Sequence, residues 1–142
     1  MGTGKGKILR ILDANANRAR EGLRVVEDYC RFVLDDEELS GELKRMRHDV
    51  TRQISAIGTT SALLRARDSE SDVGADEPEA TQPDQAQPAQ VVLANIKRAE
   101  EALRCLEEYS KVLDTRCAES FKKIRFELYT LEKKLLPLLS ER

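Results

Sequence analysis

The polar residues that stand out belong to one motif that occurs twice, N-x-x-R-A-x-E-x-L-R-x-x-E-x-Y, at residues 15–29 and 95–109. Its arginines Arg18 and Arg98 are well suited to binding phosphate, because a guanidinium can donate two parallel hydrogen bonds to it. On a helical wheel, six motif positions lie at the edge of an apolar stripe: Asn15, Arg18, Tyr29, Asn95, Arg98 and Tyr109. An unpaired charge there is costly, so each arginine needs a partner, either a glutamate or a ligand anion.

Three other motif residues, Glu21, Arg24 and Glu27, point away from this stripe on the same wheel. Exposed Glu and Arg at helical spacing usually form a solvated face with weak ion pairs. The sequence leaves open whether these three do more than that.

A second group of chemically competent residues follows in the stretch Arg65 to Gly74, which combines two arginines, three acids and a glycine. In one interpretation Arg67 binds a phosphate and Asp68 and Asp72 bind Mg²⁺. This ion favours one or two carboxylates together with oxygens of a bound ligand. In the other, the stretch is a solvated connector.

Helices must position these groups, because apolar residues recur at spacings of three and four along most of the chain. We expect a flexible leader at residues 1–7 and a single helical domain at 8–142. Within the domain, the spacing predicts repeat one at 8–66, a loop rich in Pro and Gln at 67–90, and repeat two at 91–139. Each repeat reads as a pair of helices.

A helical hairpin with an apolar stripe cannot bury that stripe alone. The sequence therefore predicts an all-α fold, a four-helix bundle made of two repeated helical hairpins with pseudo-two-fold symmetry. Dimerisation through the same surfaces stays open as an alternative.

Composition limits the functional classes. The net charge is −2, and the negative excess lies in residues 58–90, which hold two basic and seven acidic groups while both flanks are close to neutral; this argues against nucleic-acid binding. No apolar run approaches the roughly 20 residues of a membrane span, so we expect no membrane partner and a cytoplasmic protein. The three cysteines favour free buried thiols over disulfides or metal ligands.

Several stretches resemble a known family: residues 10–15, 17–29, 67–68 with 72–74, 95–111 and 125–132. In these motifs the chain is similar to the monofunctional hydroxymethylpyrimidine-phosphate kinases of thiamin biosynthesis. Members occur alone or fused N-terminally to thiamin-phosphate synthase.

The resemblance implies transfer of the γ-phosphoryl group of ATP to 4-amino-5-hydroxymethyl-2-methylpyrimidine phosphate, with Mg²⁺ as cofactor. Arg18, Arg98 and Arg67 are then expected to neutralise phosphate groups, and Asp68 and Asp72 to hold the metal. The implied substrate-binding positions are Asn15, Tyr29, Asn95, Tyr109 and Gly74. The alternative function is a non-catalytic helical module that dimerises or docks onto thiamin-phosphate synthase.

Overall fold

The computed structural model describes residues 3–58, 60–75 and 86–140, and these residues form helices and connections without a strand. The helices are α1 (Thr3–Phe32), α2 (Glu37–Ile57), α3 (Thr60–Ala66), α4 (Pro88–Ser110) and α5 (Thr115–Leu139). The predicted all-α fold is confirmed.

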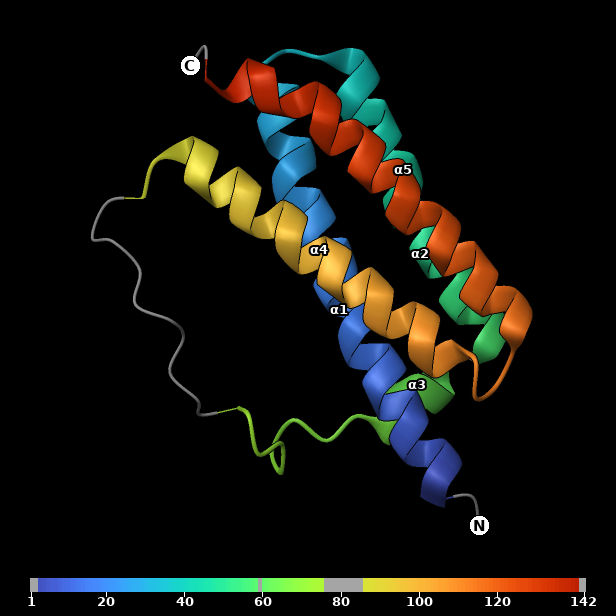
Figure 1. Cartoon of the computed structure of the whole chain (residues 1–142). Helices are drawn as coiled ribbons and strands as arrows, with labels where there is room; N and C mark the ends of the chain where they lie inside the picture. Colours follow the sequence, from blue (N-terminus) through green and yellow to red (C-terminus); the bar gives the residue numbers. More distant parts are fainter. Residues whose placement is uncertain (1–2, 59, 76–85, 141–142) are drawn as a thin grey trace.

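The four long helices pack as a bundle (Figure 1). Helices α1 and α2 form one antiparallel hairpin and α4 and α5 form the other, while α1 packs along α4 and α2 along α5. None of the described helices is long and apolar enough to cross a membrane. The pseudo-two-fold relation between the hairpins stays a prediction.

Some boundaries differ from those expected. Helix α1 begins at Thr3, within the segment assigned to the leader, and the expected loop loses its last residues to α4, which begins at Pro88. The short helix α3 was not predicted, and it packs against α1. Residues 76–85 of the expected loop lie outside the described residues.

Aspartates begin the second helix of each hairpin. The side chain of Asp36 accepts a hydrogen bond from the Leu39 backbone N–H at 2.9 Å, and that of Asp114 accepts one from Arg116 at 2.9 Å. These bonds satisfy N–H groups that have no partner inside a helix. The two caps fix where α2 and α5 start and therefore how tightly each hairpin turns.

The core follows the apolar stripes read from the sequence. Its largest fully buried side chains come from all four long helices and include Leu12, Leu23, Leu43, Met46, Ile96, Leu103, Phe121 and Leu128. The three cysteines are free, as expected. Cys30 and Cys117 are buried, whereas Cys105 is only half-buried.

Helices α1 and α4 approach closely at Gly22. A Cβ atom on this glycine would lie 2.9 Å from the Asn95 carbonyl oxygen and 3.3 Å from the Ala99 Cβ. Because real Cβ atoms are not found that close to a carbonyl oxygen, only glycine fits here without moving a helix. This contact brings the two copies of the motif face to face.

Candidate functional site

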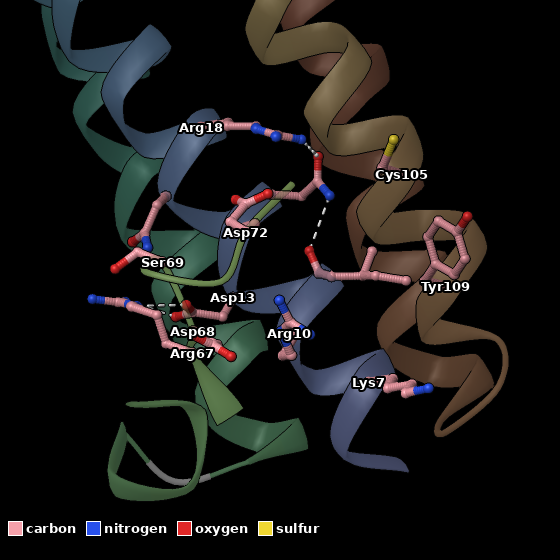
Figure 2. A pocket seen from close by; sticks show the side chains of 14 residues that line it. Lys7, Arg10, Asp13, Arg18, Arg67, Asp68, Ser69, Asp72, Cys105 and Tyr109 are labelled. Atoms are coloured by element: carbon pink, nitrogen blue, oxygen red, sulfur yellow. Dashed lines mark hydrogen bonds and ion pairs between the residues drawn. The ribbon is translucent and has the colours of Figure 1, made fainter. Parts of the chain in front are cut away.

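A cavity of about 800 Å³ opens beside the N-terminal half of α1. One wall is α1 with Lys7, Arg10 and Arg18, and a second is the C-terminal half of α4 with Cys105 and Tyr109 (Figure 2). The third wall is the segment that follows α3, residues 67–75, which we call the strap. The cavity therefore joins residues from both hairpins and from the central connection.

Three cations on α1 give the cavity its positive side. Lys7, Arg10 and Arg18 are exposed, and none has an acidic partner among the described residues. The nearest polar partner of Arg18 is the Asn15 Oδ1 atom, at 3.5 Å from its Nη1. A guanidinium without a carboxylate partner is free to bind an anion.

The strap supplies carboxylates to the same cavity. Asp68 and Asp72 line it, and both also hold the strap in shape, because Asp68 Oδ1 accepts from the Ser71 N–H at 3.0 Å and Asp72 Oδ1 from the Gly74 N–H at 2.9 Å. Within the described part of the chain no cluster of three or more His, Cys, Asp and Glu side chains could hold a metal ion. The remaining carboxylate oxygens suit a cation that takes its other ligands from a bound anion and water.

Arg67 of the strap is held by Asp13 of α1. Its Nε and Nη2 donate to the two carboxylate oxygens at 2.8 and 2.9 Å, and these bonds raise the pKa of the guanidinium. Asp13 is buried, with 8% of its side chain exposed. The expected phosphate-binding Arg67 thus already has an anionic partner within the protein.

A second cavity of about 440 Å³ lies where α1 crosses α4. Its lining holds both copies of three motif positions: Asn15 and Asn95, Arg18 and Arg98, and Glu21 and Glu101. Asn15, Arg18 and Cys105 line both cavities, so the two adjoin. The two asparagines are fixed in the same way, each donating to the backbone carbonyl four residues earlier, Ile11 and Val91.

The structure brings together most, but not all, of the predicted site residues. Eight of them line one or both cavities: Asn15, Arg18, Arg67, Asp68, Asp72, Asn95, Arg98 and Tyr109. Tyr29 lies in the core, 7% exposed, and lines neither cavity. Gly74 lies at the end of the strap and contacts Asp72 without lining either cavity.

One ion pair to a buried glutamate joins the two helices of each hairpin. Arg47 of α2 donates to both carboxylate oxygens of Glu27 at 2.6 and 3.2 Å, and Arg125 of α5 donates to Glu107 at 2.7 and 3.0 Å. Glu27 is 5% exposed, so it does not belong to the solvated face that the helical wheel suggested. These motif glutamates bind their own hairpin together and leave the cavity residues free.

Another buried acid, Glu100 on α4, lies beside Glu132 of α5. Lys97 bridges them, with its Nζ 3.2 Å from Glu100 Oε1 and 2.9 Å from Glu132 Oε2. Burial and the neighbouring Glu132 raise the pKa of Glu100 to about 7, against the opposing effect of Lys97. The other carboxylate oxygen of Glu100 is buried without a hydrogen-bond partner.

Sequence reasoning missed three charged residues of the cavity wall: Lys7, Arg10 and Asp13. Lys7 and Arg10 lie on the same helix face as Ala14 and Arg18, at spacings of three and four. This polar stripe was the available signal, and it was lost because residues 1–7 were expected to be a leader. Asp13 gave no local signal, because its partner lies 54 residues away.

Curated relatives match almost the whole chain. It is 42% identical over 129 residues to a thiamine-phosphate synthase of Nostoc punctiforme. The aligned residues make up 91% of this chain and 35% of that protein. It is also 44% identical over 129 residues to a thiamine-phosphate synthase of Synechocystis. That alignment covers 91% of this chain and 36% of the relative. The chain thus spans about a third of the length of these relatives.

These relatives correct the expected activity. They are named for a different reaction from that of a hydroxymethylpyrimidine-phosphate kinase, and the described residues, which form helices alone, do not build a kinase fold. The expected phosphotransferase activity, with ATP as co-substrate, is therefore wrong on both findings. The resemblance identified the right biosynthetic context but assigned the wrong chemistry.

No solved structure matches the chain significantly. The profile of the ThiD2 family matches residues 10–134, which include both hairpins, α3 and the strap. Together with relatives that are 40 to 44% identical over about nine-tenths of the chain, this match places it in thiamin biosynthesis. The chain belongs to the ThiD2 family.

Proposed function

We propose that the chain is a non-catalytic helical module that docks onto thiamine-phosphate synthase. The observation that carries this proposal is that proteins named thiamine-phosphate synthase contain a matching segment over about a third of their length. Interfaces between domains of one chain resemble those between separate proteins, so a segment fused to the synthase in these relatives can contact it across the same kind of surface. The module would then hold the synthase by a surface contact.

The outer side of α5 offers a surface of the right composition. Phe126 and Tyr129 are 53% and 38% exposed and form an edge-to-face pair with ring centres 5.6 Å apart. The Arg125 guanidinium lies 5.0 Å from the Phe126 ring centre and 5.6 Å from that of Tyr129. Exposed aromatic rings beside an arginine are typical of the residues that contribute most to protein–protein binding.

The docking proposal predicts that Phe126→Ala weakens a complex between this chain and the thiamine-phosphate synthase of its own organism. The loss should be about tenfold or more in Kd, because such an aromatic anchor contributes roughly 2 kcal/mol. Analytical ultracentrifugation of the mixture, with and without the variant, measures the effect.

Phe32→Ala is the matched control, because Phe32 is 65% exposed at the far end of α1 and stacks with Arg31. It should leave the complex unchanged. Failure of the wild-type chain to bind at tens of micromolar rejects docking. A self-associating chain in which Phe126→Ala restores the monomer favours the dimerisation alternative.

A second function is favoured by the free cations of the larger cavity. We infer that this cavity binds a phosphate-bearing small molecule without transferring its phosphate. Lys7, Arg10 and Arg18 supply positive charge to the bound phosphate. Mg²⁺ held by Asp68 and Asp72 would neutralise the rest of the negative charge of that phosphate. Such a site would position or retain a phosphorylated compound next to the docked synthase.

Calorimetric titration with inorganic phosphate, in the presence and absence of Mg²⁺, tests this site. Arg18→Met should weaken binding at least tenfold, because Arg18 lines both cavities, whereas Arg98→Met removes a cation from the smaller cavity alone. Arg24→Met is the control, since Arg24 is paired with Asp28 on the surface and lines neither cavity. Equal affinities for all three variants would reject the site.

A further inference from the structure

The Asp13–Arg67 ion pair connects two parts of the chain that are distant in sequence. Asp13 is in the first half of α1, and Arg67 directly follows the last residue of α3. Both Asp13 oxygens accept from the guanidinium, at 2.8 and 2.9 Å. Asp13 also lines a small cavity of about 100 Å³ behind the pair, so it stands in the wall between that cavity and the larger one.

The strap has little else that fixes it to the bundle. Among the described residues, the hydrogen bonds of residues 68–75 stay within the strap, joining Ser71 to Asp68, and Gly74 and Ala75 to Asp72. Its side chains from Asp68 to Ala75 are all exposed. The position of the strap against α1 therefore depends on Arg67, whose bonds to Asp13 are drawn in Figure 2.

The buried carboxylate needs this partner. Arg20 is the other cation close enough to act on Asp13, but its guanidinium bonds to Asn17 Oδ1 at 2.6 Å and to Thr51 Oγ1 at 3.3 Å. A buried, ionised carboxylate without a hydrogen-bonded partner is strongly unfavourable, and a bidentate bond to arginine is the strongest that a side chain provides. Asp13 therefore keeps Arg67 at this position.

We propose that Asp13 is the positioning residue of the larger cavity: its bond to Arg67 latches the strap against α1 and so builds the wall that carries Asp68 and Asp72. Arg67 acts through this latch and not as a ligand of the anion. The effect on ligand binding rests on the proposed phosphate site, whereas the effect on the strap does not.

Hydrogen exchange followed by mass spectrometry tests the latch without any ligand. Asp13→Asn keeps the shape of the side chain but removes its charge and one of the two acceptors for the guanidinium. Exchange of the backbone amides of residues 68–75 should become about tenfold faster, as expected when a charge-assisted bond to a buried carboxylate is lost. Arg67→Gln should give the same increase from the other side of the pair.

Glu27→Gln is the matched control, because Glu27 makes the same kind of bidentate bond to Arg47 from the same helix, away from the strap. It should lower the melting temperature and leave strap exchange unchanged. Wild-type exchange rates in the strap of both Asp13→Asn and Arg67→Gln would overturn the latch. A strap that opens equally in Glu27→Gln would also overturn it, because the effect would then be general destabilisation.

Titration with inorganic phosphate tests the consequence for the cavity. In Asp13→Asn the part of the affinity that depends on Mg²⁺ should be lost, because Asp68 and Asp72 are no longer held in the wall. Binding without Mg²⁺ should persist through Lys7, Arg10 and Arg18. Full Mg²⁺-dependent binding with an open strap would overturn the positioning role. If the wild-type chain binds no phosphate, the site proposal fails, and strap exchange alone then decides the latch.

Discussion

Arg125 is a charged residue that the fold buries almost completely. It is 7% exposed, and its guanidinium reaches Glu107 on α4 and the hydroxyl oxygen of Tyr129, at 3.1 Å, on its own helix. Burial disfavours the charge and lowers the pKa, but the bonds to Tyr129 and Glu107 outweigh burial and leave the pKa raised. The pair thus holds α4 and α5 together only while both partners are present.

We expect Glu107→Gln to lower the free energy of unfolding by about 3 kcal/mol, because it leaves a buried guanidinium without a counter-charge. Urea denaturation monitored by circular dichroism measures the loss. Asp28→Asn is the control: the Arg24–Asp28 pair spans 3.4 Å with about half of each side chain exposed, and its removal should cost less than about 1 kcal/mol. Equal losses in the two variants would contradict the structural role of Glu107.

At the scale of single residues, sequence reasoning found which types of side chain matter and missed their pairing. Arg18 and Arg98 were predicted to be polar groups at the edge of the stripe, and the structure places both in adjoining cavities. For Glu27 the wheel left a solvated face open as one interpretation, because it shows one helix and not the neighbour that covers it. Arg47 of α2 provides that cover.

At the scale of elements, the crossing of α1 and α4 places the two motif copies side by side. Gly22 allows this approach because any Cβ would meet the Asn95 backbone oxygen. The equivalent position in the second copy of the motif, Ala102, carries a side chain and is buried. Close contact on one side of the crossing therefore depends on a single glycine.

We expect Gly22→Ala to destabilise the bundle by about 1 to 3 kcal/mol, because relieving the 2.9 Å contact must move one helix relative to the other. The intrinsic preference of alanine for helix, about 1 kcal/mol, opposes this loss without cancelling it. The smaller cavity should change shape as well, since Gly22 lines it. Thermal unfolding measures the stability.

Gly41→Ala measures the helix preference of alanine over glycine without a steric clash, because a Cβ on Gly41 of α2 would meet no atom within 4 Å. This control should raise stability by about 0.5 to 1 kcal/mol. If Gly22→Ala were stabilising to the same extent, the close approach of α1 and α4 would be refuted.

The long helices could be predicted because their apolar stripes repeat over many turns. The short helix α3 spans Thr60–Ala66, fewer than two full turns, and such a segment carries too little periodicity to be recognised. The sequence shows which residue types make up the strap but does not predict where the strap lies. Its position is set by Asp13, 54 residues earlier in the chain. Local patterns predict elements well, and contacts between distant elements are the part that they omit.

At the scale of the whole molecule, the stability of the bundle should depend on pH through the acid pair between α4 and α5. The charged groups that act on Glu100 are Glu132 from α5 and Lys97 from α4. The pKa of Glu100 is raised to about 7 by burial and by Glu132, while that of Glu132 is lowered. The pair therefore carries a proton on Glu100 below about pH 7 and loses it as the pH rises through that value, while Glu132 stays ionised.

The sign follows from the folded and unfolded pKa values of Glu100. Because the folded value of about 7 exceeds the ordinary value of 4.5, the folded state binds the proton more tightly. The stability contribution is complete below about pH 4.5 and is lost as the pH rises through about 7. Glutamine at this position is neutral at every pH and can donate to Glu132 as the protonated acid does.

We therefore expect the stability of Glu100→Gln relative to the wild type to rise by on the order of 1 to 2 kcal/mol between pH 5.5 and pH 8.5. Urea denaturation of both proteins across this range gives the difference directly, and effects common to all other titrating groups cancel in it. Glu101→Gln on the exposed face of α4 is the matched control and should show no such divergence. A constant difference between wild type and Glu100→Gln from pH 5.5 to 8.5 would mean that Glu100 does not titrate there, and that Lys97 keeps both carboxylates ionised.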